Sequence, residues 1–300
     1  MIIDCAVIGG GPAGLNASLV LGRSRRKTIL FDDDNPRNAV TSESHGFMTR
    51  DGIDPKELRR IAQEELDKYP DVKIEKQRVQ SVHKENGLFQ IETVNGDAFK
   101  AKKIILATGF KEILPDIERV KEFYGISLFS CPFCDGWEMR DRPLAVIAET
   151  PRGFHLAKVA SNWTEDLIVC TNGKQIFSAD EKTVLENNGI QIYEQEILSL
   201  IGEKGFIEKI AFADGTVVAC EGGFIAPRWE QASSFGLSLG CKLNSQGGIE
   251  TDGLKRTTVE GVYACGDTLI AGASQLIIAA GEGSMAALSV NAAFIEEKFE

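Results

Sequence analysis

The sequence predicts an α/β protein with two dinucleotide-binding domains, the second of which is inserted in the first. Three observations support this fold class. A short apolar run meets a glycine-rich turn and a helical pattern at residues 5–22, the same order of elements recurs from residue 143, and a strand ending in Gly-Asp follows residue 246. Both domains are therefore expected to be Rossmann-like, with three layers (ββα).

The first domain is predicted to span residues 1–113. We expect a strand at 5–8, a helix after the glycines, a buried strand at 28–31 and a helix that opens at Asp54-Pro55 with an N-cap and a first-turn proline. Residues 72–109 alternate apolar and polar positions around Asn-Gly turns at 86–87 and 95–96. This pattern predicts a β-meander that returns to the parallel sheet.

The second domain is predicted to span residues 114–245. Its expected elements repeat those of the first: strands at 144–147 and 167–169 around a helix, then strands near 190–193, 206–212 and 223–226. The strand at 261–264 and a small-residue helix from Ala273 to about Phe294 follow. We expect residues 246–300 to complete the first domain, which is therefore discontinuous.

Size and composition exclude several classes of function. The 300 residues are 43% hydrophobic and carry a net charge of −11, and no long basic run is present, so a nucleic-acid partner is disfavoured. The sequence contains no run of about 18 apolar residues, so no membrane span is predicted. The first residues contain an acid where a signal peptide has bases, and seven scattered cysteines fit a reducing compartment. We therefore expect a cytoplasmic protein.

The glycine-rich turn of the first domain has the fingerprint of a dinucleotide site. Gly9 permits the tight turn, Gly11 lets backbone amides approach a pyrophosphate, and Gly14 lets the helix pack closely on the strand. The helix N-terminus opposes the phosphate charge. Asp32, about 20 residues further on, can accept hydrogen bonds from ribose hydroxyls.

The corresponding turn of the second domain, at residues 148–153, lacks this fingerprint. Ala148 and Thr150 stand where the first two glycines are needed, Glu149 adds a negative charge, and Pro151 removes an amide donor. Neither an acid for a ribose nor an arginine pair for a 2′-phosphate follows the next strand. We predict that the second domain does not bind NADPH in the usual way; a divergent loop that still binds a nucleotide is the alternative.

Cys131 and Cys134 form a Cys-x-x-Cys pair that predicts thiol–disulfide exchange. The alternatives are half of a zinc site and two unrelated core cysteines. No second Cys/His pair has suitable spacing for zinc, and no metal site is predicted. The other five cysteines lie mostly in apolar runs and are interpreted as small core residues.

Taken together, these motifs resemble the low-molecular-weight thioredoxin reductases, flavoproteins of the pyridine nucleotide-disulfide class. The similarity covers nearly the whole chain. The motifs that carry it, in family order, are Gly-Gly-Gly-Pro-Ala-Gly at 9–14, Ala-Thr-Gly at 107–109, Cys-x-x-Cys-Asp-Gly at 131–136, Gly-Val-Tyr-Ala-Cys-Gly-Asp at 261–267 and the segment from Gln275 to Ala287.

The resemblance implies that the first domain holds FAD and that the dithiol lies in the second domain. The residues it places at the cofactor are Gly9, Gly11, Pro12, Ala13, Gly14, Asp32, Asn38, His45, Val79, Thr108, Gly109, Gly266, Asp267 and Gln275. By the same resemblance, Cys134 is the sulfur that faces the flavin and Cys131 is the interchange thiol. Asp135 is the candidate general acid/base, and a helix-capping role is its alternative.

The chain also departs from typical family members, because it lacks the second glycine fingerprint and a His-Arg-Arg segment. It therefore resembles more closely the members without a standard NADPH site, which are ferredoxin-linked thioredoxin reductases and dithiol oxidases that use oxygen. The expected partner is a thioredoxin-like protein or a small dithiol or disulfide, with a ferredoxin as a second candidate. The family also implies a homodimer.

The leading hypothesis is thus an FAD-dependent thiol–disulfide oxidoreductase that moves electrons between FAD and the Cys131/Cys134 dithiol without a conventional NADPH step. One alternative is an NADPH-dependent thioredoxin reductase with a divergent nucleotide loop. The other is a flavin-bound redox sensor whose disulfide controls association with a partner.

Overall fold

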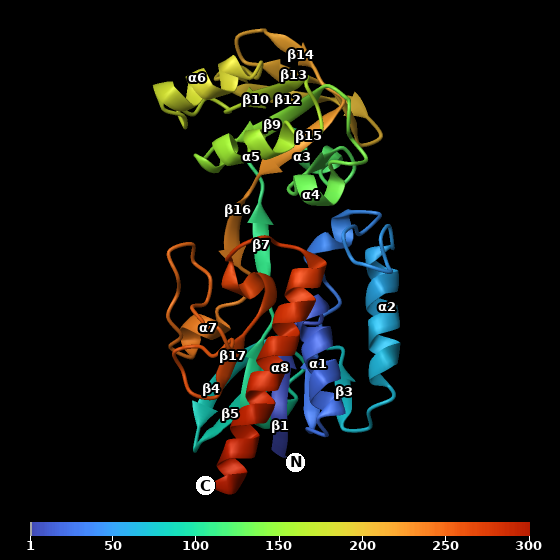
Figure 1. Ribbon diagram of the computed structural model, residues 1–300, viewed down its shortest axis with the longest axis vertical. Helices are drawn as coiled ribbons and strands as arrows, with labels where there is room; N and C mark the ends of the chain where they lie inside the picture. The colour runs from blue at the N-terminus through green and yellow to red at the C-terminus, as the bar shows by residue number, and fades with distance from the viewer. Residues whose placement is uncertain (1) are drawn as a thin grey trace. The chain divides into compact units, whose positions relative to one another are not determined.

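The computed structural model describes residues 2–300 and divides into two α/β units (Figure 1). Unit 1 contains the residues up to 39 together with 46–111 and 229–300, and unit 2 contains 40–45 and 112–228. The chain leaves unit 1 through β7 (Phe110–Ile113) and returns through β16 (Arg228–Gln231). One domain therefore interrupts the other, as the repeated pattern predicts.

The return to the first domain comes earlier than the predicted residue 246. Trp229 stacks on Phe110 at 4.8 Å between ring centroids, and the Ala232 amide donates to the Gly109 carbonyl. Cys241 is buried in the core of unit 1. These contacts join residues more than a hundred positions apart in sequence, so local spacing carried no signal for this boundary.

Unit 1 is built on a seven-stranded sheet of order β3-β2-β1-β6-β5-β4, in which β17 also pairs with β6. Its strands are β1 (Ile2–Ile8), β2 (Thr28–Phe31), β3 (Val72–Glu75), β4 (Val79–Glu85), β5 (Leu88–Thr93), β6 (Ala98–Leu106) and β17 (Val262–Ala264). The β1, β2, β3, β6 and β17 pairings are parallel. The antiparallel meander is therefore confined to β4–β6, and residues 72–75 belong to the parallel part instead.

Helices cover this sheet and place the turns that follow its strands. They are α1 (Pro12–Arg23), η1 (Arg37–Val40), α2 (Pro55–Leu66), α7 (Phe235–Ser238), η2 (Gly266–Leu269) and α8 (Leu276–Phe299). The Asp54 side chain caps α2 by accepting from the Lys56 and Glu57 amides at 2.7 and 3.1 Å. The Glu57 carboxylate pairs with Arg60 and makes no capping-box bond to the Asp54 backbone amide, so α2 has an N-cap but no capping box.

Within residues 2–300, α8 is long and apolar enough to cross a membrane by length and composition alone. The most apolar 18-residue window has a mean hydropathy of 1.3, and 39% of it is buried. The buried face, which includes Ala286, Ala287 and Val290, packs in one core with Ala17 and Leu21 of α1. Figure 1 shows the two helices side by side. α8 is thus a core helix of unit 1 with one exposed face.

Unit 2 repeats this plan with a five-stranded parallel sheet of order β11-β10-β9-β15-β8 and a three-stranded antiparallel sheet, β12-β13-β14. Its strands are β8 (Leu128–Phe129), β9 (Leu144–Ala148), β10 (Leu167–Cys170), β11 (Gln191–Tyr193), β12 (Ile197–Glu203), β13 (Phe206–Phe212), β14 (Val217–Ala219) and β15 (Gly222–Ala226). Its helices are α3 (Val120–Phe123), α4 (Pro132–Asp135), α5 (Arg152–Ala160) and α6 (Ala179–Asn187). The predicted strands of the second copy are confirmed.

Candidate functional site

The turn between β1 and α1 requires glycine at two positions for two different reasons. Gly9 has a φ of +113°, and a Cβ there would lie 2.2 Å from the Ala107 carbonyl oxygen. A Cβ on Gly14 would lie 1.8 Å from the Gly9 carbonyl oxygen. Gly9 therefore permits the turn and Gly14 permits the close approach of α1 to β1, as the fingerprint predicts.

Gly11 differs because a Cβ there would meet nothing within 4 Å. It is the N-cap of α1 and has no side-chain cap, and Pro12 and Ala13 follow in the first turn. The first-turn amides of a helix have no intrahelical acceptor, and the helix dipole favours negative charge there. Open space above glycine beside such a helix end fits the pyrophosphate of FAD.

The carboxyl ends of β6 and β17 supply the remaining polar groups near this turn. The Gly109 amide donates to Thr268 Oγ1 at 2.8 Å, and Ser233 donates to Thr108 Oγ1 at 3.1 Å. Gly266 has a φ of +66°, and a Cβ there would lie 2.8 Å from the Ala13 Cβ. The strand ends that carry the predicted cofactor residues therefore pack directly against the start of α1.

Asp267 lies at this edge as part of a small charged cluster. Its Oδ2 accepts from Arg37 Nη2 at 2.9 Å and from Ser274 Oγ at 2.6 Å, and the Arg37 guanidinium lies 4.5 Å from the centre of the Phe110 ring. Sequence reasoning missed Arg37, because its partner is 230 positions away. Its position next to the predicted Asn38 in η1 was the available signal.

Other predicted cofactor residues occupy distinct places in unit 1. Asp32 is buried at the end of β2, and Gln275 is the N-cap of α8 without a side-chain cap bond. Val79 begins β4 and packs in the core with Phe31. His45 belongs to unit 2 instead, where its Nε2 lies 3.5 Å from Glu43 and 3.8 Å from Glu138.

Cys131 and Cys134 form a disulfide in unit 2. Cys131, in extended conformation, is the N-cap of α4, and Pro132 occupies the first helical position. The Cys131 carbonyl accepts from the Cys134 and Asp135 amides at 3.1 and 3.2 Å. Position 136 requires glycine, because a Cβ there would lie 2.7 Å from the Trp163 ring. One helical turn thus holds both sulfurs and Asp135, which supports the thiol–disulfide interpretation over two unrelated core cysteines.

Asp135 has an unusual electrostatic environment. Burial raises its pKa from 3.8 to about 7, His45 opposes this increase, and the nearby Glu138 and Glu112 carboxylates add to it. The N-cap of α4 is Cys131, so Asp135 does not have the helix-capping role that was the alternative. A carboxyl group that titrates near neutral pH beside a dithiol can supply or accept a proton there.

The five other cysteines are buried, and burial raises the pKa of each thiol above its ordinary value. The pKa of Cys220 and of Cys265 reaches about 12. Since only a thiolate reacts efficiently, these residues are unreactive core positions, as predicted. The disulfide pair is therefore the reactive sulfur centre of the chain.

The turn between β9 and α5 is occupied by the protein's own side chains. Glu149 Oε1 accepts from Asn172 Nδ2 at 2.6 Å, and Asn172 Oδ1 accepts from the Ile197 amide at 2.8 Å. Pro151 is the N-cap of α5 and provides no cap bond. A carboxylate is thus fixed close to the start of α5.

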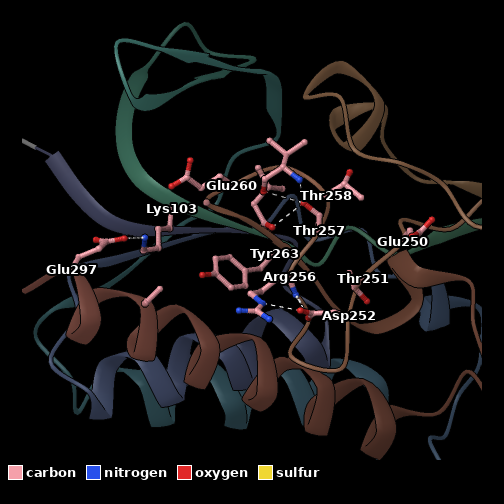
Figure 2. Close-up of a pocket in the computed structure, with 14 residues that line it drawn as sticks. Lys103, Glu250, Thr251, Asp252, Arg256, Thr257, Thr258, Glu260, Tyr263 and Glu297 are labelled. Atoms are coloured by element: carbon pink, nitrogen blue, oxygen red, sulfur yellow. Dashed lines mark hydrogen bonds and ion pairs between the residues drawn. The ribbon is translucent and has the colours of Figure 1, made fainter. Parts of the chain in front are cut away.

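A cavity of about 420 Å³ lies in unit 1 and is lined by residues of β6, β17 and α8, as well as of the segment before β17 (Figure 2). Lys103 pairs with Glu297, and Arg256 Nε donates to Asp252 Oδ2 at 2.7 Å (Figure 2). Tyr263 lies between these pairs. Both cations are neutralised by acids of the chain, so the lining offers an anion no net attraction, and none of the predicted site residues lines it.

Comparisons with known proteins agree with this geometry. A family model described as pyridine nucleotide-disulphide oxidoreductase matches residues 3–284. A candidate thioredoxin reductase from Bacillus anthracis, TrxB, is 44% identical and superimposes with a TM-score of 0.94 over 99% of both chains. The structure of HlmI is 32% identical, with a TM-score of 0.94 over 99% of this chain and 94% of HlmI. Thioredoxin reductase aclD of Aspergillus oryzae is 29% identical over 96% of this chain and 95% of its own.

The raised pKa of Asp135 makes stability depend on pH in a defined direction. The pKa of Asp135 is about 7 in the folded state and 3.8 in the unfolded chain, so the fold favours the protonated carboxyl group. The free energy of unfolding is therefore largest below about pH 4, and this contribution is lost as the pH rises through 7. Asp135→Asn mimics the protonated form. We expect the variant to have a larger free energy of unfolding than wild type above pH 7, by up to about 4 kcal/mol, and therefore a higher unfolding temperature, and we expect the difference to vanish towards pH 4.

Thermal unfolding between about pH 4 and pH 8 measures this difference. Asp180→Asn, which neutralises an exposed carboxylate on α6, is the control and should show little pH-dependent change. A difference between Asp135→Asn and wild type that stays constant over this range would contradict the assignment.

Proposed function

The chain belongs to the pyridine nucleotide-disulphide oxidoreductase family, and we propose that it passes electrons between FAD and the Cys131/Cys134 pair without a conventional NADPH step. The disulfide in α4 beside a carboxyl group with a pKa of about 7 is the observation that carries this proposal. The enzyme class and the thioredoxin reductase-like character follow from the family; the missing NADPH step is the new part.

The chemistry at the dithiol needs two electrons and two protons for each disulfide that opens. FAD, when bound at the β1–α1 turn, supplies a two-electron carrier. In this proposal Cys131 exchanges with the substrate, Cys134 faces the flavin, and Asp135 protonates the thiolate that leaves or deprotonates the thiol that attacks. Electrons enter from a ferredoxin-type protein, or leave to an oxygen-type acceptor when a dithiol is the substrate.

Two features of the β9–α5 turn support the absence of a usual NADPH step. Glu149, held by Asn172, places negative charge near the helix start where a pyrophosphate would bind. Arg152 at the same helix start donates to the Pro227 carbonyl at 3.4 Å, and burial lowers the pKa of its guanidinium. The Arg152 guanidinium is therefore engaged with the protein, while the carboxylate of Glu149 repels a phosphate.

The β9–α5 turn is expected not to hold a nicotinamide dinucleotide. Calorimetric titration of the FAD-loaded protein with NADPH or NADH should show no saturable binding up to about 1 mM, the upper end of common enzyme KM values. The Glu149 carboxylate repels the phosphates of the nucleotide, and the Cβ atoms of Ala148 and Thr150 keep a pyrophosphate away from the backbone amides. Saturation in the micromolar range would instead establish the alternative, an NADPH-dependent reductase with a divergent nucleotide loop.

The partner of the dithiol is proposed to be a thioredoxin-like protein or a small dithiol or disulfide. Phe133, between the two cysteines, is 64% exposed, and Trp137 is 65% exposed with the Arg140 guanidinium 4.1 Å from its ring centre. Exposed aromatic side chains next to a reactive disulfide favour contact with a substrate surface. A redox sensor remains the second candidate, because such a surface also suits association without turnover. The buried free thiols support a reducing, cytoplasmic location.

We also propose a homodimer, formed through the exposed face of α8. Its exposed apolar residues lie three, four or seven positions apart and so share one helix face: Ile278 (41% exposed), Met285 (39%), Leu288 (54%), Ile295 (43%) and Phe299 (82%). The small residues Gly281 and Ala292 fill the intervening positions. This is the seam of a helix pair, and antiparallel pairing about the level of Val290 sets Phe299 against Gly281 and Leu288 against Ala292. A second copy of the chain therefore fits this face.

Leu288→Glu should convert the dimer to a monomer, because pairing would bury a carboxylate in an apolar seam. Sedimentation velocity measures the change. Val184→Glu is the control, since Val184 is an exposed apolar residue on α6 of unit 2, and this substitution should leave the dimer intact. A wild-type protein that sediments as a monomer would refute the proposal, and flotation of wild type but not Leu288→Glu with lipid vesicles would assign the face to a membrane.

A further inference from the structure

The carboxyl group predicted to bind the FAD ribose is already engaged with other residues of unit 1. Asp32 Oδ2 accepts from Arg59 Nη2 at 2.6 Å and from Gln63 Nε2 at 3.2 Å. Asp32 Oδ1 accepts from the Asp34 amide at 3.0 Å. The side chains of Arg59 and Asp32 are 8% and 6% exposed, so this is a buried ion pair.

An ionised carboxylate has about four acceptor directions, two on each oxygen. The protein fills both directions of Oδ2 and one of Oδ1. Asp32 therefore has one direction left, on Oδ1, and can accept from a single ribose hydroxyl. The sequence predicts that Asp32 accepts hydrogen bonds from the ribose hydroxyls. The structure leaves room for a bond from one of these hydroxyls and not from two.

Arg59 also joins this carboxyl group to the phosphate turn. Its Nε donates to the Gly10 carbonyl at 3.4 Å, and its Nη1 donates to Asp34 Oδ1 at 2.7 Å. A Cβ on Gly10 would lie 2.1 Å from Asp32 Cγ, so the residue between the first two fingerprint glycines must also be glycine to admit the acid. The guanidinium thus fixes β2, α2 and the β1–α1 turn relative to one another.

We propose that Arg59 is the positioning residue for the adenosine half of FAD. It orients Asp32 so that the remaining direction of Oδ1 takes one ribose hydroxyl, and it neutralises a buried carboxylate that would otherwise repel the nearby pyrophosphate. The rigid fork of a guanidinium allows one side chain to bind Asp32, Asp34 and the Gly10 carbonyl together. This role is independent of the electron donor and would hold for an NADPH-dependent enzyme as well.

The test compares Arg59→Gln with Arg60→Gln in the full-length chain. Arg60 follows on the same helix, is 53% exposed and pairs with Glu57 and Glu64, so it is a matched control. The dissociation constants of FAD, ADP and 2′,3′-dideoxyADP are measured by titration of protein freed of FAD. Wild type and Arg60→Gln should prefer ADP over its dideoxy analogue. Arg59→Gln should lose this preference and bind FAD about tenfold to a hundredfold more weakly, the loss expected for hydrogen bonds to a charged group.

A purely structural role for Arg59 would lower the unfolding temperature without changing the ratio of the ADP and dideoxyADP constants. An unchanged ratio in Arg59→Gln would therefore overturn the proposal, even if FAD bound more weakly. Arg59→Lys serves as the second variant in case the glutamine variant fails to fold. Because a lysine keeps the charge but not the fork, its preference for ADP should fall between those of wild type and Arg59→Gln, and full retention would also overturn the proposal.

Discussion

The close approach of a helix to the end of a parallel strand is the constraint on which both units depend. In unit 1 a Cβ on Gly14 would lie 1.8 Å from the Gly9 carbonyl oxygen, and in unit 2 a Cβ on Gly153 would lie 2.5 Å from the Ala148 Cβ. Both crossings therefore require glycine at the third fingerprint position. Unit 2 has nevertheless lost the first two, at Ala148 and Thr150. The third glycine serves helix–strand packing in both units, whereas in unit 1 Gly9 permits the tight turn and Gly11 leaves open space at the start of α1, so the same fold forms in unit 2 without the first two glycines.

The acidic groups of the two units lie in different electrostatic environments. This difference fits the proposed roles of unit 1 in cofactor binding and of unit 2 in proton transfer at the dithiol. In unit 1 the buried Asp32 is neutralised by Arg59 and acts as a fixed acceptor. In unit 2 the partly buried Asp135 has carboxylates and a histidine as neighbours, and its pKa reaches about 7. The first arrangement favours binding and the second favours proton transfer.

Local patterns were sufficient for the elements and for the glycine turn, but contacts between distant segments were not predictable. The strand at 206–212 and the start of α1 follow from spacing, because the signal lies within a few neighbouring residues. The pairs Arg59 with Asp32 and Arg37 with Asp267 join positions 27 and 230 residues apart. Likewise, no periodicity places residues 40–45, including His45, in unit 2. The interaction partners of the site therefore required the folded structure.

We propose that the dithiol exchanges electrons with FAD without a conventional nicotinamide step. Anaerobic mixing of the FAD-loaded protein with NADPH, NADH, a small dithiol or reduced ferredoxin, followed through the flavin absorbance, tests it most directly. We expect that a dithiol or ferredoxin bleaches the flavin, that Cys131→Ser prevents bleaching by the dithiol, and that neither nicotinamide nucleotide bleaches it. Rapid bleaching by NADPH would contradict it.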